Sequence, residues 1–412
     1  MSSHDQSSSP PPLDLSAWRS VPTLLIVIGG VGALVGCITN THQFAFSWLL
    51  AFMFFLSLCL GSLGMVILHH LFDASWSVPI RRFCEHIAFL LPVMAVLFIP
   101  IAILAPKIYP WMHMVETHTQ DHSLLAKYPL FTFSGYYIGV VACFAVWGVL
   151  SYKLRYWSLE QDKTGAAECT RKMRQYSAAG IFLFALTLTL AAIVWMKALF
   201  EEWFSTMYGV WYFASSMWMA IFTIYFLATL LKRQGPLRGV ATDKTFYFIG
   251  SLMFAFTVFY AYITFFQYFI IWNANIPEET FWFTVREKGT WWYVGMIIIF
   301  GHFFLPFLTL LRIDVKVRYQ WLMLSLGVWA WLMNFFDMSF NIMPALHPNG
   351  FVLHWMDLAC LAFFAGVLSK VFLKYLNSHP IVPQKDPRFA EAMDIYVAPE
   401  SQMGAAKTGG GH

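Results

Sequence analysis

The sequence predicts an all-α polytopic membrane protein with ten transmembrane helices. Of its 412 residues, 59% are hydrophobic and only 12% are charged, which is about half the charged share of an ordinary soluble domain. A water-facing surface would need far more Lys, Arg, Asp and Glu, so most of the exterior is expected to face lipid. The apolar stretches are unbroken rather than alternating, which favours helices over the strands of a barrel. A soluble enzyme is therefore excluded.

Each of ten apolar stretches approaches the length of about 20 residues that crosses the hydrocarbon core as a helix. The predicted spans are 21–38, 46–72, 83–105, 131–152, 176–200, 206–231, 245–271, 291–311, 319–343 and 354–376. Gly29, Gly32 and Gly36 lie on one side of the first span, a pattern typical of close helix packing. Pro92 and Pro100 are expected to bend the third span.

The spans predict one transmembrane domain, residues 19–378, between a cytoplasmic N-terminal tail, 1–18, and a cytoplasmic C-terminal tail, 379–412. Their spacing fits two four-helix bundles, at about 46–200 and 206–343, plus two peripheral helices.

The segments between spans are short apart from 106–130 and 153–175, which are predicted to be loops. Neither has room for a separate soluble domain, so a redox cofactor is expected in another subunit. The Ser/Pro-rich residues 7–12 and the Gly-rich residues 409–411 are typical of mobile tails.

Charge and cysteine usage narrow the function further. Lys and Arg gather on the side of the two tails, so both termini are predicted to lie in the cytoplasm. The net charge is only +4 and no basic run is dense, so nucleic acid is not an expected partner. The six cysteines form no CxxC or CxxCH motif, which excludes a covalent haem or iron-sulfur cluster in this chain. No metal site is expected.

Ionisable residues inside spans indicate functional sites, because burying a charge in lipid is costly. The first group comprises His69, His70 and Asp73 at the end of the second span and Arg82, Glu85 and His86 at the start of the third. Separations of three and four residues place each trio on one helix face. We expect a proton uptake site near the cytoplasmic face. The alternative is a set of interfacial side chains that reach headgroup water, which fits the deeper Glu85 least.

The second group lies toward the periplasmic side. Asn334, Asp337 and Asn341 share a face of the ninth span, and His354 and Asp357 share a face of the tenth. A short connection is expected to bring the two carboxylates to similar depth, where a histidine between them can relay protons. The alternative is a satisfied polar cluster that staples two helices together.

Two further residues extend these groups. His302 is isolated in the eighth span, four residues before Pro306, and is a candidate link between the two groups. A histidine satisfied by a neighbouring helix is the commoner reading of such a residue. Gln267 shares a face of the seventh span with Thr264 and is expected to extend a polar path near its outer end.

One long segment carries a resemblance to a known family. Residues 261–268, AYITFFQY, run into 271–280, IWNANIPEET, and resemble the F subunit of alternative complex III. Supporting features are Glu85-His86 followed by Pro92, the sequence LFIP at 97–100, and the segment 286–291. The resemblance extends over nearly the whole chain. It also relates the chain to polysulfide-reductase-type (NrfD-like) membrane subunits, which contain two four-helix bundles.

The resemblance implies a cofactor-free integral subunit of the bacterial cytoplasmic membrane. Complexes of this family oxidise menaquinol or ubiquinol and pass electrons through iron-sulfur and haem c subunits to cytochrome c or directly to an oxygen reductase. A homologous NrfD-like sister subunit is expected beside this chain, and the resemblance places the quinol site there. It also implies proton-conducting half-channels in the bundles. Pro277, Glu278 and Glu279 are expected in a periplasmic loop that docks a neighbouring subunit.

Two other functions stay open at this point. A haem b carrier is one, because His69 or His70 and His86 stand at comparable depth on consecutive helices, as bis-imidazole ligation requires. A standalone secondary transporter is the other, and such proteins usually have broken helices and a midplane site.

Overall fold

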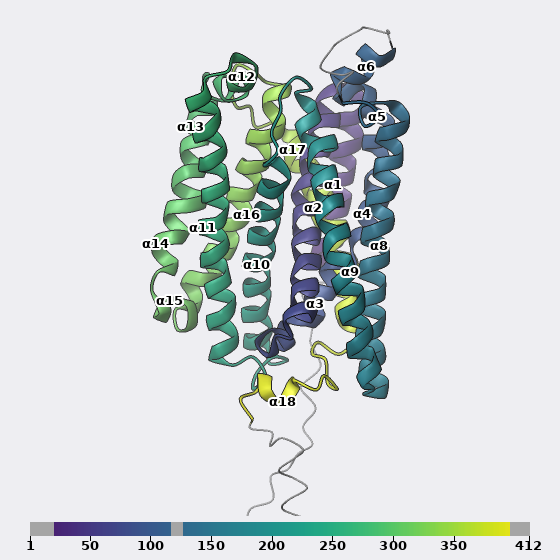
Figure 1. Cartoon of the computed structure of the whole chain (residues 1–412), viewed down its shortest axis with the longest axis vertical. Helices are drawn as coiled ribbons and strands as arrows, with labels where there is room; N and C mark the ends of the chain where they lie inside the picture. The colour runs from purple at the N-terminus through teal and green to yellow at the C-terminus, as the bar shows by residue number, and fades with distance from the viewer. Residues whose placement is uncertain (1–19, 117–126, 396–412) are drawn as a thin grey trace, which may run out of the picture.

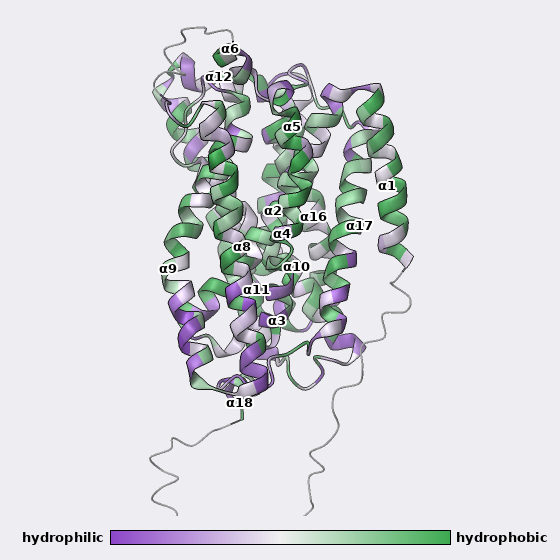
Figure 2. Ribbon diagram, turned by 90° about the vertical axis from the view of Figure 1, so that its right-hand side faces the viewer, coloured by the Kyte–Doolittle hydropathy of each residue, from purple (hydrophilic) through white to green (hydrophobic). Residues whose placement is uncertain are grey.

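The structure is a computed structural model that describes residues 20–116 and 127–395, and within these ranges it consists of helices and connecting turns without strands. Nine of the described helices are long and apolar enough to cross a membrane, or ten when the bent pair Ser75–Leu97 and Ile99–Ile108 counts as one span. The prediction of an all-α polytopic membrane protein is confirmed. Figure 2 shows the apolar belt around the middle of the molecule, with hydrophilic residues gathered at its ends.

The first half of the chain forms a helical group on the right of Figure 1. Its elements are α1 (Ser20–Thr39), α2 (Thr41–Phe72), η2 (Ser75–Ser77), α3 (Val78–Ala88), α4 (Leu91–Leu97), α5 (Ile99–Ile108), α6 (Pro110–Glu116), α8 (Phe133–Thr164) and α9 (Ala167–Ala191), which continues through η3 (Ala192–Met196) and η4 (Lys197–Leu199). Here α2 packs against α3, α4, α5 and α9, and α8 packs against α9.

The second half forms a neighbouring group on the left of Figure 1. Its elements are α10 (Tyr208–Gln234), α11 (Asp243–Ala274), α12 (Pro277–Arg286), α13 (Trp291–Ile297), η5 (Ile298–Phe304), α14 (Leu305–Leu310), α15 (Ile313–Val317), α16 (Gln320–Ile342) and η6 (Met343–Ala345). The last helices are α17 (Trp355–Ser378) and α18 (Phe389–Ala392). Helix α10 contacts α11 and α16, and also joins the two groups through α2.

Helix α1 pairs with α17 at one side of the molecule (Figure 2), and both also contact α2. The close packing predicted for the first span is confirmed. A Cβ atom added at Gly29 would lie 2.3 Å from the backbone nitrogen of Phe363, and one at Gly32 would lie 2.7 Å from the side chain of Ala359. Small residues therefore let the α1 and α17 backbones approach each other.

Helix α2 is the central helix of the fold, and its most apolar stretch is buried throughout. A Cβ atom at Gly61 would lie 2.0 Å from the main-chain oxygen of Ser216, so α2 and α10 pack backbone to backbone at this point. Because α2 contacts both helical groups and the α1–α17 pair, its side chains can reach polar partners on every side.

The third span is bent, as its prolines predict. The segment Ser75–Leu97 meets Ile99–Ile108 at an angle of 55°. Pro92 and Pro100 each stand in the first turn of a helical segment, α4 and α5, where the missing N–H removes no internal bond.

The loop predicted at 153–175 is wrong. Helix α8 continues to Thr164 and α9 begins at Ala167, so the two helices form a hairpin that extends beyond the apolar belt. Gly165, in a left-handed conformation with φ of 69°, makes the turn. The prediction relied on hydropathy, which detects where lipid ends but not where a charged helix ends. The other predicted loop, 106–130, begins with the end of α5 and with α6.

The C-terminal tail predicted from residue 379 is docked on the helices over much of its length. Residues 381–395, here called the C-terminal strap, include α18, which packs against η2 and α3. Residues 7–12 and 409–411, the predicted mobile segments, lie outside the described residues.

Candidate functional site

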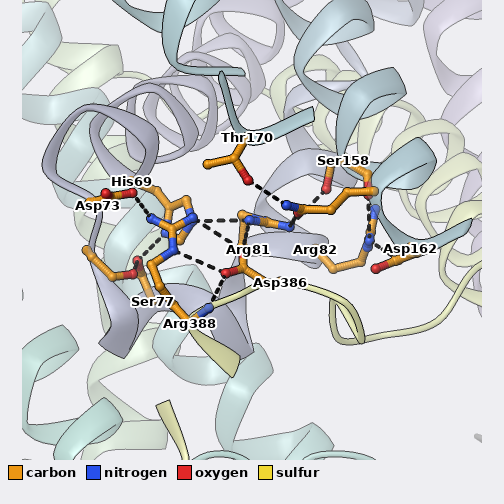
Figure 3. A network of polar contacts seen from close by, with 12 residues as sticks. His69, Asp73, Ser77, Arg81, Arg82, Ser158, Asp162, Thr170, Asp386 and Arg388 are labelled. Carbon is orange, nitrogen blue, oxygen red and sulfur yellow. Dashed lines mark hydrogen bonds and ion pairs between the residues drawn. The ribbon is translucent and has the colours of Figure 1, made fainter. Parts of the chain in front are cut away.

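Charged side chains gather at the end of the molecule where α2, α3, α8 and the C-terminal strap meet (Figure 3). This arginine cluster comprises His69, Asp73, Arg81, Arg82, Glu85, Asp162, Asp386 and Arg388. It contains most of the first group of residues that the sequence singled out, and the strap adds two charges that sequence reasoning did not place there.

Two arginines on consecutive positions of α3 form the centre of the cluster. The Arg81 Nε and Arg82 Nη1 atoms each lie 3.2 Å from an oxygen of Glu85. Arg81 also pairs with Asp386, and Arg82 pairs with Asp162 on α8. The side chains of Arg81 and Arg82 are fully buried. Burying two guanidinium groups is tolerable because each finds carboxylate partners at contact distance.

The strap supplies the outer layer of the cluster. Arg388 Nε lies 3.1 Å from Asp386 Oδ1, and Arg388 also pairs with Asp73 at the end of α2. Burial alone would raise the pKa of Asp386, but the positive charges of Arg81 and Arg388 outweigh it and hold this pKa below its usual value. Asp386 is therefore a carboxylate that holds the strap against α3.

His69 is fully engaged in the cluster. Its Nδ1 atom lies 2.5 Å from Ser77 Oγ, which in turn donates to the main-chain oxygen of Ala74 at 3.1 Å. This assigns the Nδ1 proton to the bond with Ser77, and leaves Nε2 to accept from Arg81 at 3.3 Å and Arg388 at 3.4 Å. Neither ring nitrogen of His69 is left to ligate a haem iron.

His70 and His86 lie beside the cluster rather than within it. The ring nitrogens of His70 are buried and have no hydrogen-bond partner among the described residues. His86 Nδ1 accepts from Arg155 Nε at 3.3 Å. Of the predicted trio on α3, Arg82 and Glu85 are therefore joined, whereas His86 faces α8.

A second polar network surrounds Asp337 in the apolar belt. This aspartate network comprises Ser57, Tyr208, Ser215, Tyr260, Asn334, Asp337 and Asn341, from α2, α10, α11 and α16. The Tyr260 hydroxyl donates to Asp337 Oδ1 at 2.7 Å, and the Ser215 hydroxyl lies 3.2 Å from Oδ2. Every hydrogen-bond donor to the carboxylate is a neutral hydroxyl.

The asparagines of the predicted face complete this network. Asn341 Nδ2 donates to the main-chain oxygen of Asp337 at 2.8 Å and its side-chain oxygen accepts from Tyr208 at 3.1 Å. Asn334 Nδ2 lies 3.4 Å from Ser57 Oγ on α2. The shared face that the sequence predicts for Asn334, Asp337 and Asn341 is confirmed.

His302 lies beside the aspartate network, in the π-helical segment η5. Its ring is stacked between Trp218 and Tyr260, with centroid separations of 3.8 Å on both sides and interplanar angles of 22° and 23°. The side chain is fully buried, and neither ring nitrogen has a hydrogen-bond partner among the described residues.

A third set of contacts, the outer chain, leads from the surface to Asp357. His347 Nε2 lies 2.8 Å from Gln43 Oε1, Gln43 Nε2 donates to Ser47 Oγ at 3.2 Å, and Ser47 donates to Asp357 Oδ1 at 2.5 Å. His347 is partly exposed, whereas Asp357 is 2% exposed. Burial lowers the pKa of His347, which favours its neutral form.

The expected meeting of Asp337 and Asp357 beside a relaying histidine does not describe the structure. Asp337 bonds to α10 and α11, whereas Asp357 bonds to Ser47 on α2. The reason is helix order: α17 packs on α1 and α2, and α16 packs on α10. His354 instead caps α17, accepting from the backbone of Met356 at 3.3 Å while its own N–H donates to Asp357 at 3.0 Å.

Gln267 and the predicted docking residues stand apart from these three networks. Gln267 Oε1 is buried on α11 without a hydrogen-bond partner among the described residues. Pro277, Glu278 and Glu279 form the first turn of α12 rather than a loop, with Pro277 at a position where its missing N–H is harmless. Docking of a neighbouring subunit at this turn stays a prediction.

Sequence reasoning missed the hydroxyl groups that hold both carboxylates. Ser47, Ser215 and Tyr260 look unremarkable in apolar spans, because hydroxyls can satisfy themselves on the helix backbone. One signal was present: Gln43 and Ser47 are polar residues four apart on α2, and such pairs meet on one helix face.

Arg286 was also missed. It is buried at the end of α12 and donates to the main-chain oxygens of Trp282, Phe340 and Asn341 at 2.8 to 3.1 Å. Its guanidinium carbon lies 3.4 Å from the Trp282 ring centroid. Burial lowers the pKa of Arg286. Because the α16 carbonyls that it bonds carry the negative end of the helix dipole, Arg286 closes that helix end beside the aspartate network.

Comparisons of the sequence with models of protein families and with curated proteins found no match. Within residues 20–116 and 127–395, no group of three or more His, Cys, Asp or Glu side chains is arranged to bind a metal ion. The chemistry of the site therefore has to be inferred from its own contacts.

Proposed function

We propose that the protein is an integral membrane subunit of a respiratory quinol-oxidising complex of the alternative complex III type. In this proposal it carries no redox cofactor and supplies proton-conducting polar paths and a structural anchor. Iron-sulfur and haem c subunits carry the electrons to cytochrome c or an oxygen reductase, and a homologous sister subunit binds the quinol. The sequence resemblance supports the family, and the polar networks support proton conduction.

The observation that carries proton conduction is the environment of Asp337. Its carboxyl group is buried in the apolar belt, and its hydrogen-bond donors are the hydroxyls of Tyr260 and Ser215. A hydroxyl can donate to an ionised carboxylate and accept from a protonated one. Both protonation states of Asp337 can therefore be satisfied without rearranging the helices, as a proton carrier requires.

The outer chain supports the same function. A hydrogen-bonded row of side chains from partly exposed His347 to buried Asp357 is an arrangement that can pass a proton inward from one surface. Glu85, by contrast, is held by two guanidinium groups, which favours a fixed charge and an anchoring role for the arginine cluster.

The proposed location is the bacterial cytoplasmic membrane with both termini in the cytoplasm. Lys and Arg gather on the side of the tails, in keeping with the positive-inside rule. The lower end of α1 and the strap with α18 lie toward the same end of the molecule in Figure 2. In this orientation the arginine cluster faces the cytoplasm and the outer chain opens to the periplasm.

Purification of the tagged full chain in mild detergent tests the family assignment. We expect iron-sulfur and haem c subunits to co-purify with it, together with quinol oxidation activity. Isolation of the chain alone, with no redox partner, would contradict the assignment and favour a standalone transporter. A haem b absorbance in the isolated chain would also contradict it.

Proton conduction is tested with Asp337→Asn in the complex reconstituted in vesicles. We expect normal assembly and electron transfer, but fewer protons moved per electron. Asp394→Asn is the matched control, because this side chain is half exposed and pairs with Lys244 on the strap side. An unchanged proton-to-electron ratio in assembled Asp337→Asn complex would reject the conducting role.

A further inference from the structure

The stack of Trp218, His302 and Tyr260 has more chemistry than packing requires. Both neighbours lie face to face with the imidazole at 3.8 Å, and no part of the His302 side chain is exposed. A phenyl ring would fill the same slot, yet His302 places two polar nitrogens in a buried space without a partner among the described residues. Buried polar atoms without partners are rare in native proteins and usually indicate a bound water or a functional role.

The backbone around His302 is also unusual. It lies in the π-helical segment Ile298–Phe304, between α13 and α14. Such segments are rare and often mark functional positions. The Trp329 indole N–H donates at 2.8 Å to the main-chain oxygen of Gly301, the residue before His302, and so holds this segment in place. The imidazole is therefore fixed by the fold on both of its faces.

The surroundings favour a positive charge on this ring. The faces of indole and phenol rings attract cations, most strongly where water is excluded. Tyr260, one of the two stacked rings, also donates its hydroxyl to Asp337 at 2.7 Å, so the histidine and the carboxylate contact opposite parts of the same residue. An imidazolium here would lie close enough to compensate an ionised Asp337 in a medium of low dielectric.

We propose that Trp218 and Tyr260 form an aromatic cage in which His302 holds a proton as imidazolium, and that His302 and Asp337 act as one proton-storing pair. When His302 gains the proton, the Asp337 carboxyl group has lost it, so the buried pair stays neutral overall. Only an O–H and an N–H bond change, and internal water at the ring nitrogens carries the proton between them. This inference rests on the proposed function and specifies where the conducted proton resides.

No other charged group competes for this role among the contacts described for the cage. From α11 the titratable neighbour is Tyr260, and from α16 it is Asp337, reached through Tyr260. From α10 the neighbour is Trp218, whose indole N–H is occupied by Thr257 at 2.9 Å. His302 is thus a positioning residue for the charge on Asp337.

The test is a pH titration of the full chain in lipid nanodiscs, followed by infrared difference spectroscopy. The carboxyl band of Asp337 is identified by its absence in Asp337→Asn. His302→Phe keeps the three-ring stack but removes both nitrogens. We expect the midpoint of the Asp337 band to move up by about one pH unit, a tenfold change in proton affinity, because the compensating cation is gone. An unchanged midpoint overturns the proposal.

Two further samples protect the test against a folding defect. His42→Phe, at an exposed histidine on α2, is the matched control and should leave the midpoint in place. If His302→Phe does not fold, nitrogen NMR of histidine-labelled wild type and Trp218→Leu replaces it. We expect a buried imidazolium signal in the wild type that is lost in Trp218→Leu. A neutral His302 throughout the range in which Asp337 titrates overturns the proposal.

The outcomes separate the inference from the proposed function. A shifted Asp337 band with unchanged proton-to-electron ratios in Asp337→Asn would refute conduction but keep the pair. An unshifted band with altered ratios would refute the pair and keep conduction.

Discussion

The strap is expected to be released when its buried carboxylate is neutralised. In Asp386→Asn, Arg81 and Arg388 lose a fully buried partner. Removing one member of a buried pair costs about 3 to 5 kcal/mol. Arg81 keeps Glu85 at 3.2 Å and Arg388 keeps Asp73, so we expect the lower end of this range. About 3 kcal/mol corresponds to a roughly hundredfold larger open population of residues 381–395.

Hydrogen exchange measured by mass spectrometry checks this prediction. Peptides that cover the strap should exchange roughly a hundredfold faster in Asp386→Asn, whereas peptides from the buried α2 should not change. Asp394→Asn removes an exposed ion pair with Lys244, a type worth less than about 1 kcal/mol, and is the control. Exchange of the strap within twofold of wild type would show that Asp386 does not hold it.

The same contact predicts how the strap responds to pH. Because the pKa of Asp386 is lower in the folded protein than in an unfolded chain, its ionised form stabilises the docked strap. This contribution is fully present above the ordinary value of about 4 for an aspartate, and is lost as pH falls through the lower folded value. Strap exchange that accelerates in acid in wild type, but not in Asp386→Asn, is the expected result.

Two further changes probe the packing of the helices. Gly61→Ala would place a methyl group 2.0 Å from the Ser216 backbone oxygen and should destabilise by about 3 kcal/mol or more, whereas Gly148→Ala meets no atom within 4 Å and should leave the melting temperature unchanged or raised. Equal melting temperatures for the two variants would contradict the close contact of α2 and α10. Arg286→Lys should also lower the melting temperature, by an amount equivalent to about 3 kcal/mol, because an ammonium group cannot bond three carbonyls while stacking on Trp282. Wild-type stability of this variant would show that the planar group is not needed.

The apolar spans and the bend at Pro92 and Pro100 could be predicted from the sequence, because lipid imposes length and composition on each helix and proline constrains the backbone locally. The face shared by Asn334 and Asp337 could be predicted for the same reason, since helix geometry fixes it. These features depend on residues close together in the chain.

What the sequence did not reveal depends on contacts between distant segments. Asp386 looks like an ordinary charged residue of a tail, and its place between two arginines follows from how the strap folds back onto α3. Ser47 and Tyr260 become partners of carboxylates only through the order in which the helices pack. That order is a property of the whole bundle, and hydropathy along the chain carries no record of it.

The enclosure of α2 also shapes how this protein can evolve. A helix with one side in lipid accepts exchanges among apolar residues on that side, so its tolerance rises and falls with each turn, as expected for α1 with Leu24, Val27 and Val31 exposed. The buried stretch of α2 has no such permissive side. Across homologues, its positions should therefore diverge slowly and without helical rhythm, which would make α2 the most faithful ancestral signature in the chain.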